Sequence, residues 1–529
     1  MIINNIIYHR RQEIRKILFA SFILLSFLHC SCLIIIKKNG LSIATYNIPN
    51  LFSYNRLFNI PRRSPLNNEN YGESLPNEKF YAGAARVSLL DNRFLGSISD
   101  DIPLSGYGAR QKINIQSIEL ELNPETTGMS PHYHFFRRNK GVKDDIYSRA
   151  LVIKVGDVKL AIVSVDIIGI TQDLYDIVFN KLSNQNVGFN NRSQLILSAT
   201  HTHSGPGACA TRPLWKICTG DIFVPTVMEK LSDGIVESVL QADISIEEVK
   251  IGFGKFHLPG LQSNRRKKFY PSNQAPLDDE IVFLQIRRIK DNSILGHLIN
   301  FAVHCTALPP SNNKFSADVG GSIMNSIENY FIGSIALFIN GAEGDVSPSV
   351  PKGEDKIKFI GAKITQAIVI NSKNISFSEK GRMIIINKHI KLPKPKLDLS
   401  ALATLSSDSK FLADYISGDI SLSGWVEESS YLNAVYIDNS IEKLTISTIP
   451  GEAITEIGMI IKKFIKNCTS NYNLHTVIAG LSNGYIGYIA TKEQFHKGGY
   501  ESLATLYDEN TGQFIVDSVK NLFETILPQ

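Results

Sequence analysis

Cysteine and tryptophan are scarce in this chain. Its 529 residues include 6 cysteines and 2 tryptophans, and no two cysteines have the spacing Cys-x-x-Cys. So few cysteines exclude a small disulfide scaffold, and their spacing excludes the usual structural zinc sites. An excess of charge of one sign is also missing, because 55 lysines and arginines face 50 aspartates and glutamates. A net charge of +5 is too dilute over this length for nucleic-acid binding, so no nucleic-acid partner is expected.

Internal repeats and low-complexity segments are absent too. Hydrophobic residues make up 43% of the chain and charged residues 20%, which is ordinary for a globular protein. This balance excludes a wholly disordered chain and a polytopic membrane protein. The length allows one large α/β domain or several smaller ones.

The N-terminus departs from this average. Basic residues between positions 10 and 16 precede the uncharged apolar run Ile17–Ile36, which ends at Lys37 and Lys38. Such a run is long enough to cross a bilayer as a helix, and the basic flank favours an N-terminus that stays inside. Residues 1–38 are therefore expected to be a signal or membrane anchor, with the rest exported and either anchored on the outer side or secreted. Lipid attachment at Cys30 or Cys32 is a further alternative.

Two further regions are expected after residues 1–38. Residues 39–79 mix Asn, Pro, Ser and Arg without periodicity, which predicts a linker. Residues 80–529 alternate β-rich apolar runs with amphipathic stretches, which predicts a mixed α/β domain. In an exported protein Cys209 and Cys218 could form a disulfide, and unpaired thiols are the equally open alternative.

Periodicity locates several elements of this domain. Residues 150–155 and 158–165 are β-branched runs around the two-residue turn Gly156-Asp157, which predicts a hairpin. Apolar spacing near 3.6 predicts helices over Gln172–Ser183, Thr226–Gln241 and Glu452–Lys466, and a further helix over Phe514–Leu527. Strands are expected over Phe283–Ile289 and Met383–Ile390.

Five apolar runs of strand length end in loops rich in Gly, His, Ser, Pro or Tyr. The runs are Leu195–Ala199, Leu298–Val303, Ile335–Ile339, Leu444–Ile449 and Thr476–Leu481. Ligand sites of open α/β sheets lie just beyond the carboxyl ends of strands. The five loops are therefore expected to meet in one site.

The residues that could meet there have the chemistry of a metal site. His201, His304, Glu452 and Tyr488 form a nitrogen- and oxygen-rich set that suits a borderline divalent ion such as zinc. Bound zinc lowers the pKa of a water from 15.7 to about 7, which makes hydroxide available for attack on a carbonyl. By itself His201-x-His203 is a weak signal, because alternate residues of a strand share a face.

Other residues suggest alternatives. His132 and His134 have the same spacing but are interpreted as structural or substrate-lining. Ser347 lies in the glycine-rich segment Gly344–Pro348, which favours a serine hydrolase, although the chain has no Gly-x-Ser-x-Gly motif. A turn or helix-capping serine is the other interpretation of Ser347.

Taken together, these segments resemble the neutral ceramidase family. The matching motifs, in order, are Gly83–Val87, Gly106–Gly108, His201–Gly207, Asn300–His304, Gly344–Pro348, Pro450–Glu452, Tyr485-x-x-Tyr488 and Tyr500. The resemblance covers roughly residues 80–529 and implies the mixed-sheet α/β catalytic domain of that family. Family members of full length add an immunoglobulin-like C-terminal domain, which is expected to be missing here.

The resemblance also implies roles for particular residues. It implies one zinc ion per chain, bound by His201, His304, Glu452 and Tyr488. His203 and Tyr500 would contact the amide and its oxyanion, and Arg265, in an Asn-Arg pair, would lie near the reacting groups. Ser347 would either attack or, as we favour, orient substrate and water.

The function expected from the sequence is zinc-dependent hydrolysis of the amide bond of N-acylsphingosine (ceramide) or a related N-acyl lipid, giving a fatty acid and a sphingoid base. The substrate would be an amphiphile taken from a membrane or micelle. Two alternatives stay open: a serine-type amidase or lipase that uses Ser347, and a non-catalytic exported lipid-binding protein.

Overall fold

A computed structural model describes residues 33–38, 41–47, 70–110, 136–398, 419–469 and 473–527. Most of the predicted signal or anchor run, residues 17–32, lies outside these ranges, as do His132 and His134. The last residues of the run, Leu33–Ile36, belong to a strand and not to a helix. None of the helices in the described ranges combines the length and apolarity that crossing a bilayer requires.

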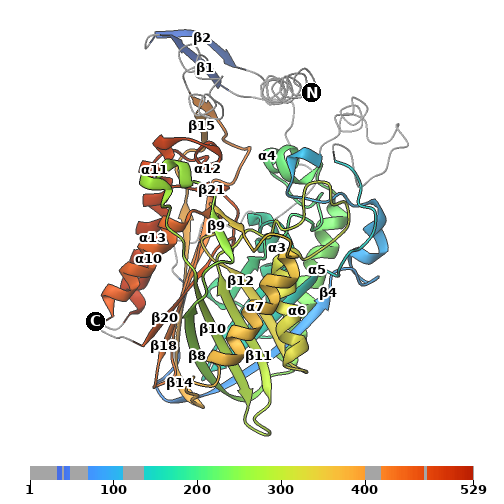
Figure 1. Ribbon diagram of the computed structural model, residues 1–529, viewed down its shortest axis with the longest axis vertical. Helices are drawn as coiled ribbons and strands as arrows, with labels where there is room; N and C mark the ends of the chain where they lie inside the picture. The colour runs from blue at the N-terminus through green and yellow to red at the C-terminus, as the bar shows by residue number, and fades with distance from the viewer. Residues whose placement is uncertain are drawn as a thin grey trace.

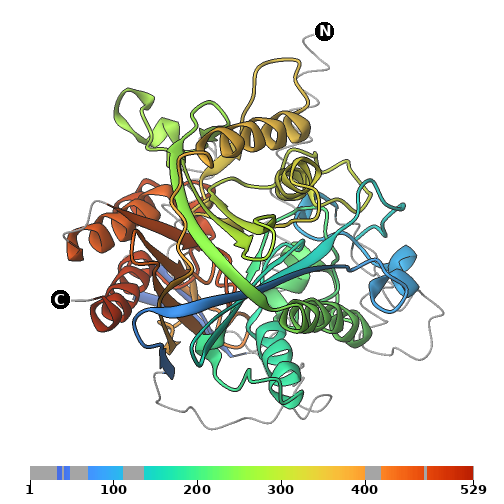
Figure 2. The ribbon, with the colours of Figure 1, turned by 90° about the horizontal axis from the view of Figure 1, so that it is seen from below.

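One sheet organises the described part of the chain, and it contains 13 strands. It has three walls that meet near β4 (Figures 1 and 2). The first wall contains β4 (Glu78–Ser88), β5 (Tyr147–Val155), β6 (Val158–Val165) and β7 (Leu195–Ala199). The second contains β8 (Glu247–His257), β10 (Glu280–Arg288), β11 (Ile294–Phe301) and β12 (Ile335–Asn340). The third contains β3 (Asn70–Glu73), β14 (Lys380–Lys391), β17 (Ser429–Asp438), β18 (Lys443–Thr448) and β20 (Leu474–Ala479).

The walls enclose an apolar core because both faces of many strands are hydrophobic. In β5, Leu151 and Ile153 belong to the core between the walls, whereas Ala150 and Val152 face the opposite side. This alternation follows from the two-residue period of a strand. Since the outer faces are apolar too, they need helices to cover them.

Three pairs of helices provide this cover (Figure 2). They are α3 (Gln172–Asn184) with α5 (Pro225–Ile244) on the first wall, α6 (Asp318–Tyr330) with α7 (Lys356–Asn371) on the second, and α10 (Thr455–Cys468) with α13 (Thr511–Ile526) on the third. Local signals fix some of their ends. The Thr171 hydroxyl accepts from the Leu174 N–H at the start of α3, and Asp355 caps α7 in the same way.

Most predicted elements are confirmed. The hairpin is β5–β6, with Val155 paired to Val158 around the predicted turn. The helices predicted over Gln172–Ser183, Thr226–Gln241 and Phe514–Leu527 are α3, α5 and α13, and the strands predicted over Phe283–Ile289 and Met383–Ile390 are β10 and β14.

Two predicted boundaries are wrong. Helix α10 begins at Thr455, and Glu452 lies in the two-residue strand β19 (Glu452–Ala453), which pairs in parallel with β21 (Tyr488–Ile489). The predicted linker, residues 39–79, includes structured segments, because β3 pairs with β14 and β4 already begins at Glu78. In both cases pairing with a distant strand decides the local structure.

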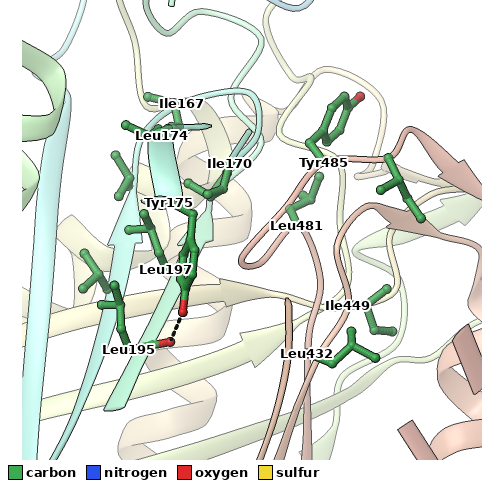
Figure 3. Packing of buried hydrophobic residues seen from close by; sticks show 14 of the residues in the cluster. Ile167, Ile170, Leu174, Tyr175, Leu195, Leu197, Leu432, Ile449, Leu481 and Tyr485 are labelled. Carbon is green, nitrogen blue, oxygen red and sulfur yellow. Dashed lines mark hydrogen bonds between the residues drawn. The ribbon is translucent and has the colours of Figure 1, made fainter. Parts of the chain in front are cut away.

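The five strand ends that were expected to meet do lie together. The Gly480 N–H, after β20, donates to the Asn340 carbonyl of β12 at 2.9 Å, and the Ala199 N–H of β7 donates to the Leu481 carbonyl at 3.2 Å. Figure 3 shows Leu197 and Leu481 in the apolar cluster beneath this junction, with the Tyr175 hydroxyl donating to the Leu195 carbonyl at 3.4 Å. Apolar packing therefore supports the loops that carry the polar residues.

Smaller elements surround the junction of the strand ends. Strands β9 (Gln262–Asn264) and β13 (Val346–Pro348) pair with each other, and short helices α4 (Pro213–Trp215), α11 (Lys492–Lys497) and α12 (Tyr500–Leu503) lie in the connecting loops. A separate sheet joins β1 (Leu33–Lys38) and β2 (Leu41–Asn47) to β16 (Asp419–Ser421) and β15 (Lys396–Asp398).

Candidate metal centre

Two imidazoles and a carboxylate meet where the strands end. His201 follows β7, His304 follows β11, and Glu452 lies in β19. The Oε2 atom of Glu452 is 3.3 Å from His201 Nε2 and 3.1 Å from His304 Nε2. All three side chains are almost completely buried, so little water reaches this point. The three residues, which lie far apart in the sequence, thus face one another in a dry cluster.

The second nitrogen of each of these rings is held by a backbone carbonyl. His201 Nδ1 lies 2.6 Å from the Ile168 carbonyl oxygen, and His304 Nδ1 lies 2.8 Å from that of Glu343. A carbonyl oxygen can only accept, so each Nδ1 carries the proton and each Nε2 presents a lone pair to the cluster. Metal-binding histidines are oriented in this way.

His201 also has a strained backbone, with φ at +67°. A bulky side chain rarely adopts this left-handed conformation, which costs on the order of 1–3 kcal/mol. The strain is offset by neighbours, because the His201 N–H donates to the Ile167 carbonyl at 3.1 Å. Such strain is typical of residues whose position matters more for function than for stability.

The two oxygens of Glu452 differ in their surroundings. Oε1 accepts a hydrogen bond of 2.5 Å from the Tyr485 hydroxyl, whereas Oε2 is buried without a hydrogen-bond partner. Burial would raise the pKa of Glu452, but positive charge and hydrogen bonds from protonated imidazoles of His201 and His304 outweigh it and hold that pKa well below its ordinary value. When both Nε2 atoms are deprotonated, a bound cation would supply that positive charge instead. The carboxylate is therefore ionised, with one oxygen directed at the imidazoles.

Tyr488 and Arg265 complete one side of the cluster. The Tyr488 hydroxyl is 3.2 Å from His304 Nε2 and accepts a hydrogen bond of 3.3 Å from Arg265 Nη2. Arg265 also pairs with Glu501 at 3.2 Å and donates to the Gly344 carbonyl. Its neighbour Arg266 is buried and binds the same Glu501 at 3.0 Å.

His203 lies on the other side of His201. Its Nε2 is 3.3 Å from His201 Nε2, and its ring packs on Tyr107 with centroids 4.6 Å apart. Arg110, a buried residue, donates to the His203 carbonyl and holds the loop in place. Burial, with the neighbouring imidazoles, lowers the pKa of His203 well below its ordinary value, so its ring is neutral at pH 7.

Tyr500 lies at the edge of the cluster. Its ring meets that of Tyr488 edge to face, with centroids 5.3 Å apart, and it is 59% exposed. Desolvation and then the charge of Glu452 raise the pKa of Tyr500 to about 12, although water screens part of this effect at an exposed ring. Tyr500 is therefore a protonated phenol that incoming molecules can reach.

The surroundings of Ser347 do not favour a nucleophilic role. It lies in β13, paired with Ser263 of β9, and its backbone neighbour Val346 accepts a hydrogen bond from the His304 N–H at 3.0 Å. Among the described residues, no histidine or carboxylate is hydrogen-bonded to the Ser347 hydroxyl. A serine nucleophile needs such a base within hydrogen-bond reach, so the geometry does not favour the serine-hydrolase interpretation.

Sequence reasoning missed Glu343. His201, His304, Glu343 and Glu452 each offer a ligand atom, and these four atoms lie within 4.8 Å of one another. Burial, and then the charge of Glu452, raises the pKa of Glu343 well above its ordinary value. The available signal was a carboxylate inside the predicted loop after β12, four residues before Ser347, which drew attention instead.

The donor set fits a divalent ion. Two imidazole lone pairs and a carboxylate oxygen without a partner converge, and they would repel one another without a cation between them. Zinc accepts imidazole and carboxylate ligands, and so do several other divalent metals. The buried cluster could thus hold a metal ion, and the donors alone do not identify which one.

The cysteines lie outside this centre. Cys209, Cys218, Cys305 and Cys468 are free thiols, so the structure does not form the Cys209–Cys218 disulfide that the sequence left open. Burial raises the pKa of the Cys209 thiol to about 12, and that of Cys218 likewise. Neutral thiols of this kind are poor nucleophiles.

Comparison with known proteins gives a consistent result. The sequence profile of the family described as neutral/alkaline non-lysosomal ceramidase, N-terminal, matches residues 126–365 and 433–517. The chain is similar to the neutral ceramidase of Mycobacterium tuberculosis, at 27% identity over 40% of this chain and 36% of that protein. It is also similar to neutral ceramidase A of Dictyostelium discoideum, at 22% identity over 63% of this chain and 61% of that protein. In both cases the match spans less than two thirds of the relative's length.

Solved structures share the fold. A ceramidase complexed with C2 has a TM-score of 0.67 at 17% identity, covering 85% of this chain and 76% of that one. The neutral ceramidase of Pseudomonas aeruginosa has a TM-score of 0.66 with the same identity and coverage. The profile matches more than half of the chain and includes His201, His304, Glu343 and Glu452. The protein therefore belongs to the neutral/alkaline non-lysosomal ceramidase family.

Proposed function

We propose that this protein hydrolyses the amide bond of N-acylsphingosine or a related N-acyl lipid, with one zinc ion held by His201, His304, Glu452 and Tyr488. The observation that carries the proposal is the convergence of two oriented Nε2 lone pairs on the unpartnered Oε2 of Glu452. Family membership supports a lipid amide as the substrate. The products would be a free fatty acid and a sphingoid base.

The metal supplies one part of this chemistry. When bound, zinc acts as a Lewis acid and lowers the pKa of a coordinated water toward about 7. The chain's own residues supply the rest. Glu452 provides the negative charge that holds the cation, and Tyr485 fixes its orientation through the 2.5 Å hydrogen bond to Oε1. Arg265, which donates to the Tyr488 hydroxyl at 3.3 Å, holds that phenol against His304.

The developing oxyanion needs hydrogen-bond donors. Tyr500 is protonated at neutral pH and accessible, and His203 is a neutral imidazole with one N–H to donate. Donors that are already in place stabilise negative charge in the transition state at little cost of reorganisation. Ser347, in the adjacent strand β13, would orient substrate or water by hydrogen bonding. The substrate is proposed to be an amphiphile drawn from a membrane or micelle.

Metal content and activity test the proposal together. The full-length protein is purified in detergent, its metals are measured by mass spectrometry, and it is incubated with ceramide in mixed micelles with and without a chelator. We expect one zinc per chain and activity that a chelator abolishes and zinc restores.

Ligand variants localise the metal. His304→Ala and Glu452→Gln should each lose the metal, and activity should fall at least about 100-fold. These changes remove metal ligands themselves, whereas loss of a residue that only hydrogen-bonds to a ligand typically costs about 10–100-fold. His257→Ala is the control, because His257 is an exposed histidine paired with Asp279 at 2.7 Å, outside the cluster. Wild-type metal content in both ligand variants would refute the site.

The serine alternative predicts the opposite pattern. A serine-type amidase would keep its activity in chelator and lose it on covalent labelling of Ser347 by a phosphonate. A lipid-binding protein without turnover would bind ceramide and release no fatty acid during long incubation.

We further propose that the chain is exported, either anchored on the outer side or secreted. The basic flank and the apolar run before Lys37 support this proposal. Protease added to intact cells should degrade the domain if it is anchored outside, and the culture medium should contain it if it is secreted. Protection of the domain in intact cells, together with its absence from the medium, would refute export.

A further inference from the structure

Glu343 is a buried carboxylate without a hydrogen-bond partner. Its side chain is 0% exposed, and neither Oε1 nor Oε2 has a partner among the described residues. Leaving a carboxylate in such surroundings is costly unless a cation or donors compensate it. Arg265, whose charge acts on Glu343, uses its guanidinium on Glu501, Tyr488 and the Gly344 carbonyl instead. No described residue compensates the charge of the Glu343 carboxylate, so a bound cation is the partner that would stabilise it.

The backbone holds this carboxylate in place. The Glu343 carbonyl accepts from His304 Nδ1 at 2.8 Å and from the Val346 N–H at 2.8 Å. The next residue, Gly344, donates its N–H to the Ala453 carbonyl at 2.8 Å, beside Glu452. Residue 343 is thus tied to two segments that carry cluster residues. A loosely placed surface glutamate would have none of these restraints.

The end of β20 leaves room for the Glu343 side chain. Gly480 lies opposite, and a Cβ atom at that position would come within 3.1 Å of Glu343 Oε2. The carboxylate occupies this space with its oxygens in the same cluster as His201, His304 and Glu452, all four ligand atoms within 4.8 Å of one another. Donors at about 2.0–2.2 Å from one ion lie at most about 4.4 Å apart. A small contraction would therefore bring all four onto a single ion.

We propose that Glu343 is a fifth protein ligand of the ion, beside the proposed ligands His201, His304, Glu452 and Tyr488. This inference deepens the proposed function and rests on it. Two carboxylates would balance the charge of a divalent ion in a buried site, so that the ion and its ligands would be neutral together. The additional oxygen donor also favours a coordination number above four and makes the site more accepting of ions such as Mn²⁺ or Co²⁺.

Cobalt binding tests the role of Glu343 without relying on activity. The full-length protein is stripped with a chelator and titrated with Co²⁺ against a competing chelator, and the visible absorption of the bound ion is recorded. Four-coordinate Co²⁺ absorbs more strongly than five- or six-coordinate Co²⁺. We expect Glu343→Gln to weaken Co²⁺ binding at least about 10-fold and to increase the molar absorption, because the ion loses one oxygen ligand.

The glutamine variant is informative because it mimics a protonated glutamate. If Glu343 merely donated a hydrogen bond as a neutral acid, Glu343→Gln would keep the wild-type affinity and spectrum. That result, with Co²⁺ bound normally by the wild type, would overturn this inference and leave the proposed function standing. Failure of the wild-type protein itself to bind metal would instead refute both.

A matched control separates ligation from burial. Glu427 is another buried glutamate, and its Oε2 accepts from Trp215 Nε1 at 2.9 Å outside the cluster. Glu427→Gln should leave the Co²⁺ affinity and spectrum unchanged. Glu343→Ala serves as a second variant should Glu343→Gln fold poorly, and it should show the same loss of affinity. An equal loss in the Glu427 variant would count against a specific role for Glu343.

Discussion

The imidazoles of His201 and His304 both direct Nε2 at Glu452 because their Nδ1 atoms are hydrogen-bonded to backbone carbonyls. Each Nδ1 is held by a carbonyl, at 2.6 and 2.8 Å, so each Nε2 is left to face Glu452. Tyr485 gives Glu452 the same kind of support from the opposite oxygen. Supporting residues of this kind commonly change metal affinity 10–100-fold when they are removed.

We therefore predict that Tyr485→Phe weakens metal binding by about 10–100-fold without unfolding the protein. The ring still packs against Trp215, whose centroid is 4.8 Å away, so apolar packing is retained while the hydrogen bond to Glu452 is lost. Competition with a chelator measures the affinity, and circular dichroism checks the fold. An unchanged affinity would mean that Glu452 is oriented without Tyr485.

A second histidine provides a pH prediction away from the metal. His297 of β11 is 0% exposed, and its Nε2 accepts from Gln285 Nε2 at 2.8 Å. Burial, with the charge of Arg287, lowers the pKa of His297 from 6.5 to about 3. Between these values the unfolded chain binds a proton that the folded protein does not, so stability should fall as the pH falls from 6.5 toward 3, at up to about 1.4 kcal/mol per pH unit.

Urea unfolding at several pH values between 7 and 4 measures this dependence. The variant His297→Gln keeps a hydrogen-bond acceptor but cannot titrate, so its stability should depend less steeply on pH than that of the wild type. Other titrating groups are common to both proteins and cancel in the difference. Equal slopes would show that His297 is not held neutral.

At the scale of elements, the close packing of β12 and β20 shapes the site. A Cβ atom on Gly480 would lie 2.2 Å from the Gly341 carbonyl oxygen, which is backbone and cannot move aside. We predict that Gly480→Ala destabilises the protein by about 1–3 kcal/mol through overpacking and weakens metal binding by displacing Glu343.

Denaturant unfolding and metal titration measure the two effects of Gly480→Ala. Gly220→Ala is the control, because the nearest atom to a Cβ there is the Trp215 carbonyl oxygen at an ordinary 3.5 Å. Metal binding that stays at the wild-type level in Gly480→Ala would show that the end of β20 tolerates movement.

The elements also show where periodicity succeeds and fails. Strand β5 alternates inner and outer apolar residues over its length, so its pattern predicts a strand directly. The apolar spacing of residues 452–466 predicts a helix too, but its first residues form β19, because Glu452 pairs with Tyr488 of β21. A two-residue parallel pairing leaves no periodic trace in the sequence.

At the scale of the whole molecule, the third wall of the sheet, which contains β14, also includes β3, a strand within the predicted linker. Strand β3 pairs with residues 384–387 of β14, and its Gly72 lies against Ile385. Removing residues 1–77, which takes away β3 and leaves β4 whole, should therefore expose apolar surface of β14 and lower the free energy of unfolding by about 2 kcal/mol.

Removing residues 1–69 takes β1 and β2 from the separate sheet but keeps β3 and every cluster residue, so metal binding should stay nearly unchanged. Both truncated proteins lack β1 and β2, so their difference in stability reports the contribution of β3. Urea unfolding and metal titration of the two truncated proteins measure the difference. Equal stability of the two would show that β3 contributes little to the sheet.

The sequence by itself determined the mixed α/β class, most strands and helices, and three of the residues that meet at the cluster, His201, His304 and Glu452, but not Glu343. Apolar periodicity reports which face of a local segment is buried, and the motifs around His201, His304, Glu452 and Tyr488 keep their order along the chain. Predicted ligands of the metal could thus be named, although their roles stay predictions. The proximity of Arg265 and His203 to these residues followed from the family resemblance.

Only the tertiary structure decided how these residues face one another. It assigns the tautomers of His201 and His304, brings the Tyr485 hydroxyl to Glu452, and places the carboxylate of Glu343 in the same cluster. Each of these contacts joins segments far apart in the chain through hydrogen bonds and close packing at strand ends. No local pattern of residues encodes such contacts, because their geometry exists only once the three walls of the sheet have come together.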